Sequence, residues 1–225
     1  MTSKILIRNL YKIYNENKDN EFFALKDINI DINNGEIVII KGISGSGKST
    51  LLSLMGALSK PSRGDILVDE QNIAKLPDIF ASRYRNEDVG FIFQSFNLVD
   101  GLSVYDNVKA PLVLSKLKES ELKKKINIAL ELANISHKSE QMVSNLSGGE
   151  KQRCAIARAL VNSPSIILAD EPTANLDRKN SLLFVDILEK FKELNKTVVV
   201  ATHDSIFDNL SFVDKCINIE DGVII

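Results

Sequence analysis

The residues best suited to chemistry begin with the glycine- and serine-rich segment GISGSGKS at positions 42–49. It matches the phosphate-binding pattern GxxxxGK[ST] and stands between an apolar run and a helical pattern, which is the context such a loop needs. Glycines let successive backbone N–H groups point at phosphate oxygens, and the start of the following helix adds partial positive charge. The expected phosphate-binding residues are Gly42, Ser44, Gly45, Ser46, Gly47, Lys48, Ser49 and Thr50.

Within this loop, Lys48 is expected to reach the β- and γ-phosphates of a nucleotide, and the Ser49 hydroxyl is expected to bind Mg²⁺. The structural alternative is a flexible glycine and serine turn whose helix is capped by Ser49.

Two carboxylates, Asp170 and Glu171, follow an apolar run that predicts a strand. The carboxyl ends of parallel strands line the ligand crevice of such sheets. Asp170 is therefore a candidate to hold Mg²⁺ through a water, and Glu171 a candidate general base for an attacking water. A carboxyl group beside phosphates should have a raised pKa, because like charges disfavour ionisation. The alternative is a strand-end turn with two solvated acids, closed by Pro172.

A second glycine motif, LSGGE at positions 146–150, precedes a helical pattern. Ser147 is a predicted helix N-cap, and Glu150 would complete a capping box, which is a sufficient structural explanation by itself. The functional interpretation is a second anion site, with Gly148 and Gly149 offering N–H groups at a helix start. Because the helical segment is expected to one side of the first loop, this site would face a nucleotide bound by a second copy of the chain.

The elements that must position these residues follow from the hydrophobic pattern. Strands are predicted at 37–40, 65–69, 89–93, 165–169, 197–201 and 215–219, of which 37–40, 165–169 and 197–201 should be buried, with helices at about 49–58 and 181–194. Between about 96 and 161 the strand signal is absent, and apolar residues recur at helical spacing from Leu122 to Ala133. The alternation predicts an α/β fold with a parallel-sheet core and an α-helical lobe inserted in its middle.

Composition narrows the class of protein. The chain has 225 residues, 44% hydrophobic and 26% charged, with a net charge of −2, so it favours neither nucleic acid nor anionic lipid. Its apolar runs are too short to span a bilayer, and the first ten residues lack the apolar region of a secretory signal. We therefore expect a cytoplasmic protein, with Cys154 and Cys216 reduced and buried in the core.

With a phosphate loop, a glycine motif and an Asp-Glu strand in this order, the chain resembles the ABC ATPases along essentially its whole length. The resemblance implies a P-loop NTPase (RecA-like) core with an N-terminal antiparallel β region and an inserted α-helical subdomain. It implies a core of about 1–95 and 162–225 and a helical subdomain of about 96–161. It also implies that residues 146–150 are the family's signature motif.

Four more site residues follow from the resemblance. Gln94 would contact Mg²⁺ or the attacking water and sense a membrane partner, and Asp177 would cross a dimer interface. His203 would hold the γ-phosphate, and Tyr14 would stack on adenine. The structural alternatives are a polar strand cap for Gln94, a structural histidine for His203 and a core aromatic for Tyr14.

The chain departs from the common family pattern in minor ways. Lys41 stands before the phosphate loop where an apolar residue is usual, and would add positive potential or extend to solvent. Glu150 and Lys151 replace the frequent Gln-Gln. Within the family, the sequence segments 91–98 and 167–177 most resemble those of ATP-binding subunits of lipoprotein-release, macrolide-export and bacitracin-type peptide-resistance systems.

The resemblance implies Mg²⁺-dependent ATP hydrolysis in a head-to-tail homodimer that drives a separate integral-membrane permease. The chain would lie in the cytoplasm, peripheral to the inner face of the cell membrane, with no nucleic-acid partner. Two alternatives remain: a soluble ABC protein acting on DNA or the ribosome, and a cell-division type that transmits force without transport. The single ATPase unit and the absence of heptads and of a basic surface signature disfavour the soluble alternative.

Overall fold

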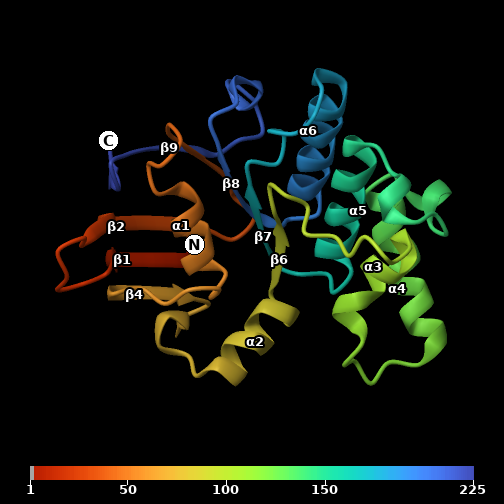
Figure 1. Ribbon diagram of the computed structural model, residues 1–225, viewed down its shortest axis with the longest axis horizontal. Helices are drawn as coiled ribbons and strands as arrows, with labels where there is room; N and C mark the ends of the chain where they lie inside the picture. The colour runs from red at the N-terminus through yellow and green to blue at the C-terminus, as the bar shows by residue number, and fades with distance from the viewer. Residues whose placement is uncertain (1–2) are drawn as a thin grey trace.

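Ten strands in two sheets position the functional segments in the computed structural model, which describes residues 3–225 (Figure 1). The larger sheet has the strand order β10-β9-β3-β8-β7-β6. Its parallel strands are β3 (Ile37–Lys41), β6 (Val89–Ile92), β7 (Ile166–Asp170), β8 (Thr197–Thr202) and β9 (Lys215–Glu220). The edge strand β10 (Val223–Ile224) is antiparallel to β9. The predicted parallel sheet is therefore confirmed.

The central strands of this sheet are apolar on both faces. In β3, Ile37 and Ile39 belong to one core cluster, while Val38 and Ile40 belong to a second cluster on the opposite face. Because successive side chains of a strand point to opposite faces, a continuous apolar run fits only a sheet that is covered on both sides. Burial of the sheet on both faces therefore explains the short unbroken apolar runs in the sequence.

One face is covered by a smaller antiparallel sheet and by the helix that follows the phosphate loop. The smaller sheet has the order β2-β1-β4-β5, from β1 (Ser3–Tyr14), β2 (Phe22–Asn33), β4 (Arg63–Val68) and β5 (Gln71–Asn72). Helix α1 (Lys48–Met55) buries Leu51, Leu52 and Met55 in the cluster that these strands share with the larger sheet. The expected N-terminal antiparallel region is thus confirmed, and helix α2 (Asp78–Glu87) precedes β6.

The other face is covered by helices, most of them from the segment between β6 and β7. They are α3 (Val104–Lys109), α4 (Glu119–Leu132), α5 (Gly148–Leu160) and, after β7, α6 (Arg178–Glu193). Short 3₁₀ helices cover Ile73–Lys75, Ala110–Leu112, Ser136–Lys138, Val143–Asn145 and Ser205–Phe207. Helices α3, α4 and α5 gather to one side of the larger sheet (Figure 1). Residues 96–161, all described, contain no named strand, as predicted.

The subdomain boundaries remain our proposal: a core of about 1–95 and 162–225 with a helical subdomain of about 96–161. Residues 1 and 2 of that core lie outside the described residues. Among the described residues, the structure contains no helix that is both long and apolar enough to span a membrane.

One predicted burial is wrong. Cys154 is buried in α5, where burial raises the pKa of its thiol to about 12, but Cys216 on β9 is exposed. In β9 the alternate residues Ile217 and Ile219 face the shared apolar cluster, so Cys216 points to the other face, which is uncovered there.

Candidate nucleotide site

The phosphate loop connects β3 to α1, and its last glycine caps the helix. Gly47 has φ 107°, a backbone conformation that glycine adopts without strain, and a Cβ there would lie 2.6 Å from the carbonyl oxygen of Ala24. Within residues 3–225, no protein acceptor receives the backbone N–H groups of Gly45, Gly47 or Ser49. These donors at a helix start fit an anion that supplies oxygen acceptors.

Lys48 extends its ammonium group along the inside of the loop. Its Nζ donates to the backbone oxygens of Gly42 at 2.7 Å and Ile43 at 3.0 Å, and lies 3.5 Å from Oε1 of Glu171. Lys48 is buried, so this cation is positioned by the loop carbonyls and by one carboxylate rather than by solvent.

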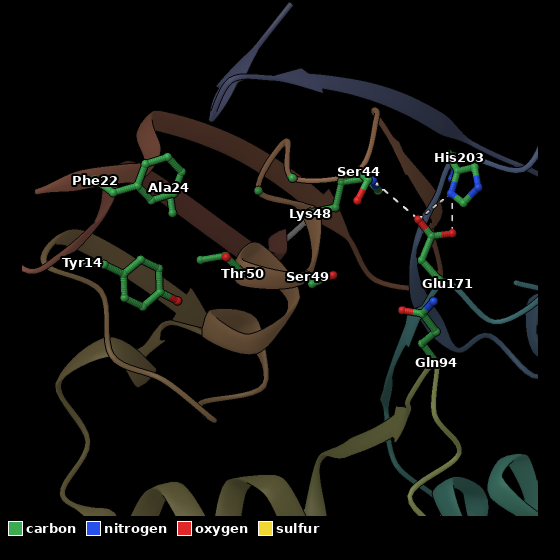
Figure 2. A pocket seen from close by; sticks show the side chains of 12 residues that line it. Tyr14, Phe22, Ala24, Ser44, Lys48, Ser49, Thr50, Gln94, Glu171 and His203 are labelled. Carbon is green, nitrogen blue, oxygen red and sulfur yellow. Dashed lines mark hydrogen bonds and ion pairs between the residues drawn. The ribbon is translucent and has the colours of Figure 1, made fainter. Parts of the chain in front are cut away.

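Glu171 lies directly after β7, in a left-handed backbone conformation with φ 44°. Its N–H donates to the backbone oxygen of Ala201 in β8 at 2.8 Å. Its side chain, 10% exposed, places Oε1 2.9 Å from Nδ1 of His203, as Figure 2 shows. A left-handed backbone is unfavourable for a glutamate, so the surrounding structure must hold Glu171 in place.

Asp170, the residue before Glu171, is the last residue of β7. Its carboxylate accepts a hydrogen bond from the Ser49 hydroxyl at 2.9 Å. Burial, assisted by the charge of Glu171, raises the pKa of Asp170, while the Ser49 hydrogen bond and Lys48 oppose that rise. Burial therefore raises the pKa of Asp170 more than the charge of the neighbouring Glu171 does.

These oxygen groups fit a magnesium ion bound together with phosphate. Among residues 3–225, no group of three His, Cys, Asp or Glu side chains could hold a metal alone. Mg²⁺ prefers oxygen ligands and usually binds through one or two protein groups plus substrate phosphates. The Ser49 hydroxyl and the Asp170 carboxylate, joined by their hydrogen bond at the loop, meet that description.

An aromatic wall lies at the far end of the same cavity, which measures about 380 Å³ (Figure 2). Tyr14 of β1 and Phe22 of β2 are paired across the two strands and are 43% and 57% exposed. Lys12 Nζ lies 5.1 Å from the centre of the Tyr14 ring. Tyr14 is therefore a lining residue, and the alternative of a core aromatic does not fit its exposure.

The cavity contains most of the residues that the sequence singled out. Its lining residues are Tyr14, Phe22, Ala24, Ser44, Gly45, Gly47, Lys48, Ser49, Thr50, Gln94, Glu171 and His203. Gly42 and Ser46 belong to the loop without lining the cavity. The sequence analysis missed Phe22 and Ala24, because only the register of β1 on β2 brings them beside Tyr14.

The signature residues lie elsewhere. Ser147 caps α5, its N–H donates to Glu150 Oε2 at 2.8 Å, and the predicted capping box is confirmed. These hydrogen bonds lower the pKa of Glu150 to about 2. Gly148 is exposed at the helix start, while a Cβ at Gly149 would lie 2.1 Å from Oδ1 of Asn180.

Asp177 is linked to these signature residues through Asn180. It caps α6 by accepting from the N–H of Asn180 at 2.8 Å, so the starts of α5 and α6 are neighbours. This capping also explains why α6 begins three residues before the predicted helix. None of Ser147, Gly148, Gly149 and Asp177 lines the cavity of its own chain.

A phosphate loop at the carboxyl end of a parallel strand, with an acid pair on a nearby strand, defines a P-loop ATPase of the ATP-binding-cassette type. A family profile described as "ABC transporter" matches residues 25–174. The chain therefore belongs to this family, as an ATP-binding subunit.

Several relatives are similar over most of this chain. The lipoprotein-releasing system ATP-binding protein LolD of Pseudoalteromonas translucida is 40% identical, over 89% of this chain and 86% of LolD. The macrolide export ATP-binding/permease protein MacB of Chlorobium luteolum is 39% identical over 90% of this chain but only 30% of MacB. The dimeric structure of the cassette MJ0796 in a post-hydrolysis state, bound to ADP and Pi, superposes with a TM-score of 0.89. The two are 38% identical, over 98% of this chain and 96% of MJ0796; a further MJ0796 dimer gives 0.90.

Proposed function

We propose that the cavity binds Mg·ATP with adenine on the aromatic wall and the phosphates in the loop. Tyr14 offers its ring face to the purine, and Phe22 widens the apolar surface beside it. The N–H groups of the loop and the Lys48 ammonium hold the phosphates. Ser49, Asp170 and Gln94 hold Mg²⁺, which would offset negative charge on the β- and γ-phosphate oxygens.

Glu171 acts as the general base in hydrolysis to ADP and phosphate. The contact that carries this assignment is the 2.9 Å approach of His203 Nδ1 to Glu171 Oε1 at the cavity wall. The carboxylate accepts a proton from water while that water attacks the γ-phosphate. Lys48 and His203 donate to phosphate oxygens as negative charge develops there, and Gln94 orients the water.

Two copies of the chain form each active site, arranged head to tail. The start of α5 presents N–H groups that do not reach the cavity of their own chain, which supports a role on a partner's nucleotide. In the sandwich, Ser147 and Gly149 approach the γ-phosphate held by the partner's loop, and Asp177 crosses the interface. The MJ0796 structures, described as dimeric, are consistent with this arrangement.

The dimer drives a separate integral-membrane permease that serves antimicrobial-peptide resistance or the export of peptide, lipoprotein or drug. A hollow of about 260 Å³ beside the Gln94 loop, lined in part by Phe91, Phe93 and Pro111, supports permease docking between core and helical lobe. Docking near residues 94–105 holds the chain at the inner face of the cell membrane. Pull-down of the permease encoded by a neighbouring gene, co-expressed with this chain, tests the docking. If substitutions far from the hollow release the permease, the proposed docking site is wrong.

Glu171→Gln tests the base. We expect phosphate release to fall at least a hundredfold, because general-base catalysis contributes about 10² to 10⁴-fold, while ATP still binds. Glu189→Gln, on an exposed turn of α6, is the matched control and should keep full turnover. If Glu171→Gln also turns over normally, Glu171 is not the base.

The same variant tests the dimer. With ATP, Glu171→Gln should sediment as a dimer because hydrolysis no longer separates the copies, and it should return to monomer with ADP. A variant that binds ATP but stays monomeric at high protein concentration contradicts the sandwich.

A further inference from the structure

Arg158, in the last turn of α5, contacts two successive backbone carbonyls of a distant loop. Its guanidinium donates to the backbone oxygen of Phe96 at 2.6 Å and to that of Asn97. Within residues 3–225 no carboxylate forms an ion pair with Arg158. Burial lowers the pKa of this guanidinium, so the contact is made at an electrostatic cost. The contact ties the end of α5 to these two carbonyls.

Those carbonyls belong to the loop that carries Gln94. Phe96 and Asn97 both adopt left-handed backbone conformations, with φ 60° and 50°. Asparagine adopts this conformation fairly readily, but for the bulky Phe96 it is unfavourable and needs support from neighbouring groups. The loop is also held at its other end, where Nδ2 of Asn175 donates to the Gln94 carbonyl at 3.0 Å.

The helix that supplies Arg158 also contacts the other parts of the site. It begins at the Ser147 cap, and Gln152 donates to the carbonyl of Pro172, next to Glu171, at 2.9 Å. A rigid helix thus joins the signature start, the Glu171 turn and the Gln94 loop.

We propose that Arg158 is a positioning residue that clamps the strained turn at Phe96 and Asn97, so that Gln94 is held at the cavity wall and moves together with α5. The effect on turnover rests on the proposed role of Gln94, whereas the order of the loop does not depend on that role. Lysine replaces the clamp poorly, because a single ammonium lacks the planar fork that reaches two successive carbonyls.

Arg158→Met and Arg158→Lys test the clamp, with Lys196→Met as the matched control. Lys196 likewise donates to two successive carbonyls, Ser163 at 3.3 Å and Pro164 at 2.7 Å, and Ser163 is also left-handed. Arg158→Met should lower kcat roughly tenfold or more by misplacing Gln94, with the ATP Kd within about twofold of wild type. Amide hydrogen exchange at residues 95–98 should accelerate. Arg158→Lys should give a kcat and an exchange rate between those of wild type and Arg158→Met. Lys196→Met should change neither of them, nor the ATP Kd.

Phe96→Gly distinguishes positioning from general stability. Glycine adopts the left-handed conformation without strain, so Phe96→Gly should restore part of the kcat and of the exchange protection lost in Arg158→Lys. Unchanged exchange at 95–98 in Arg158→Met, or an equal loss in Lys196→Met, overturns the proposal, as does the absence of restoration. Faster exchange in Arg158→Met without a change in kcat would support the ordering of the loop by Arg158. It would contradict the proposed role of Gln94 in turnover.

Discussion

At the scale of single residues, one carboxylate faces two basic groups. Glu171 contacts both His203 and Lys48, and the loop carbonyls share the ammonium of Lys48. A phosphate oxygen would compete with those carbonyls for the same ammonium, because a charged acceptor forms the stronger hydrogen bond. The arrangement therefore keeps a carboxylate, an ammonium group and an imidazole in one place without a ligand, and in the proposed mechanism little reorganisation would be needed for catalysis.

The aromatic wall allows a prediction for nucleotide affinity. Tyr14→Ala should raise the ATP Kd about 3- to 10-fold, corresponding to the roughly 1 kcal/mol of an aromatic contact. Tyr14→Phe should have little effect, and Phe22→Ala an intermediate one, measured by fluorescence titration. Phe23→Ala is the control, because Phe23 follows Phe22 on β2 and does not line the cavity. An equal loss in Phe23→Ala would indicate that the hairpin, not the wall, was damaged.

At the scale of elements, helix starts carry the site. Helix α1 starts at an N-cap glycine with no side-chain cap, and α5 starts with a full capping box. The difference matches their surroundings, because a side chain at Gly47 would collide with β2, whereas Ser147 has an open position. In the proposed mechanism each start supplies backbone donors for an anion, and the local sequence determines how each start is capped.

The capping box predicts a pH-dependent stability. Glu150 has a folded-state pKa of about 2, lowered from 4.5, so its contribution is complete above pH 4.5 and is lost as the pH falls towards 2. Glu150→Gln should therefore be about 1 kcal/mol less stable than wild type at pH 7, and the difference should shrink below pH 4.5. Urea unfolding at several pH values measures this, with Glu131→Gln on α4 as control. A difference that does not depend on pH would contradict the charge assignment.

Two loop glycines separate backbone strain from steric collision. At Gly45, φ is +82° with no atom within 4 Å of a Cβ, while Gly47 combines φ +107° with the Ala24 carbonyl at 2.6 Å. Gly45→Ala should cost about 1 kcal/mol of unfolding free energy, and Gly47→Ala about 3 kcal/mol or more. Urea unfolding without nucleotide provides the comparison, and Gly101→Ala, in open space, is the control. Equal losses of unfolding free energy at Gly45 and Gly47 would contradict the prediction. They would show that the backbone moves enough to avoid the contact between the new Cβ and the Ala24 carbonyl.

At the scale of the whole molecule, buried side chains form two separate apolar cores, one on each face of the larger sheet. One joins α1 and the antiparallel sheet to the larger sheet, and the other joins the helical segment to its opposite face. The phosphate loop thus belongs to one side of the larger sheet and the start of α5 to the other. In the proposed dimer, a chain built in this way presents two incomplete half-sites, and a second copy completes both.

Mixing two inactive variants tests composite sites. Lys48→Ala removes phosphate binding, and Gly148→Asp places a negative charge at an exposed helix start, which the helix tolerates but a phosphate does not. An equal mixture should recover about a quarter of wild-type phosphate release, since half of the dimers are mixed and each holds one intact site. The double variant in a single chain is the control and should stay inactive after mixing with either. No recovery in a mixture that forms dimers would place each active site within one chain.

The sequence by itself determined the local features. The phosphate loop, the Asp170-Glu171 strand end and the Ser147 capping box each depend on neighbours within a few residues, so spacing alone predicts them. The buried parallel strands also followed from pattern, because a sheet covered on both faces needs unbroken apolar runs.

Only the tertiary structure decided which distant residues meet. Phe22 reaches Tyr14 through a β1–β2 register that shifts several times between Ser3 and Ile13, and spacing does not encode such shifts. Lys41, whose role was open, forms an ion pair with Asp208, and Cys216 lies on the uncovered face of β9. Arg158 contacts a loop about sixty positions earlier in the chain. These contacts follow from packing and strand order, which arise from the whole chain at once rather than from any single segment.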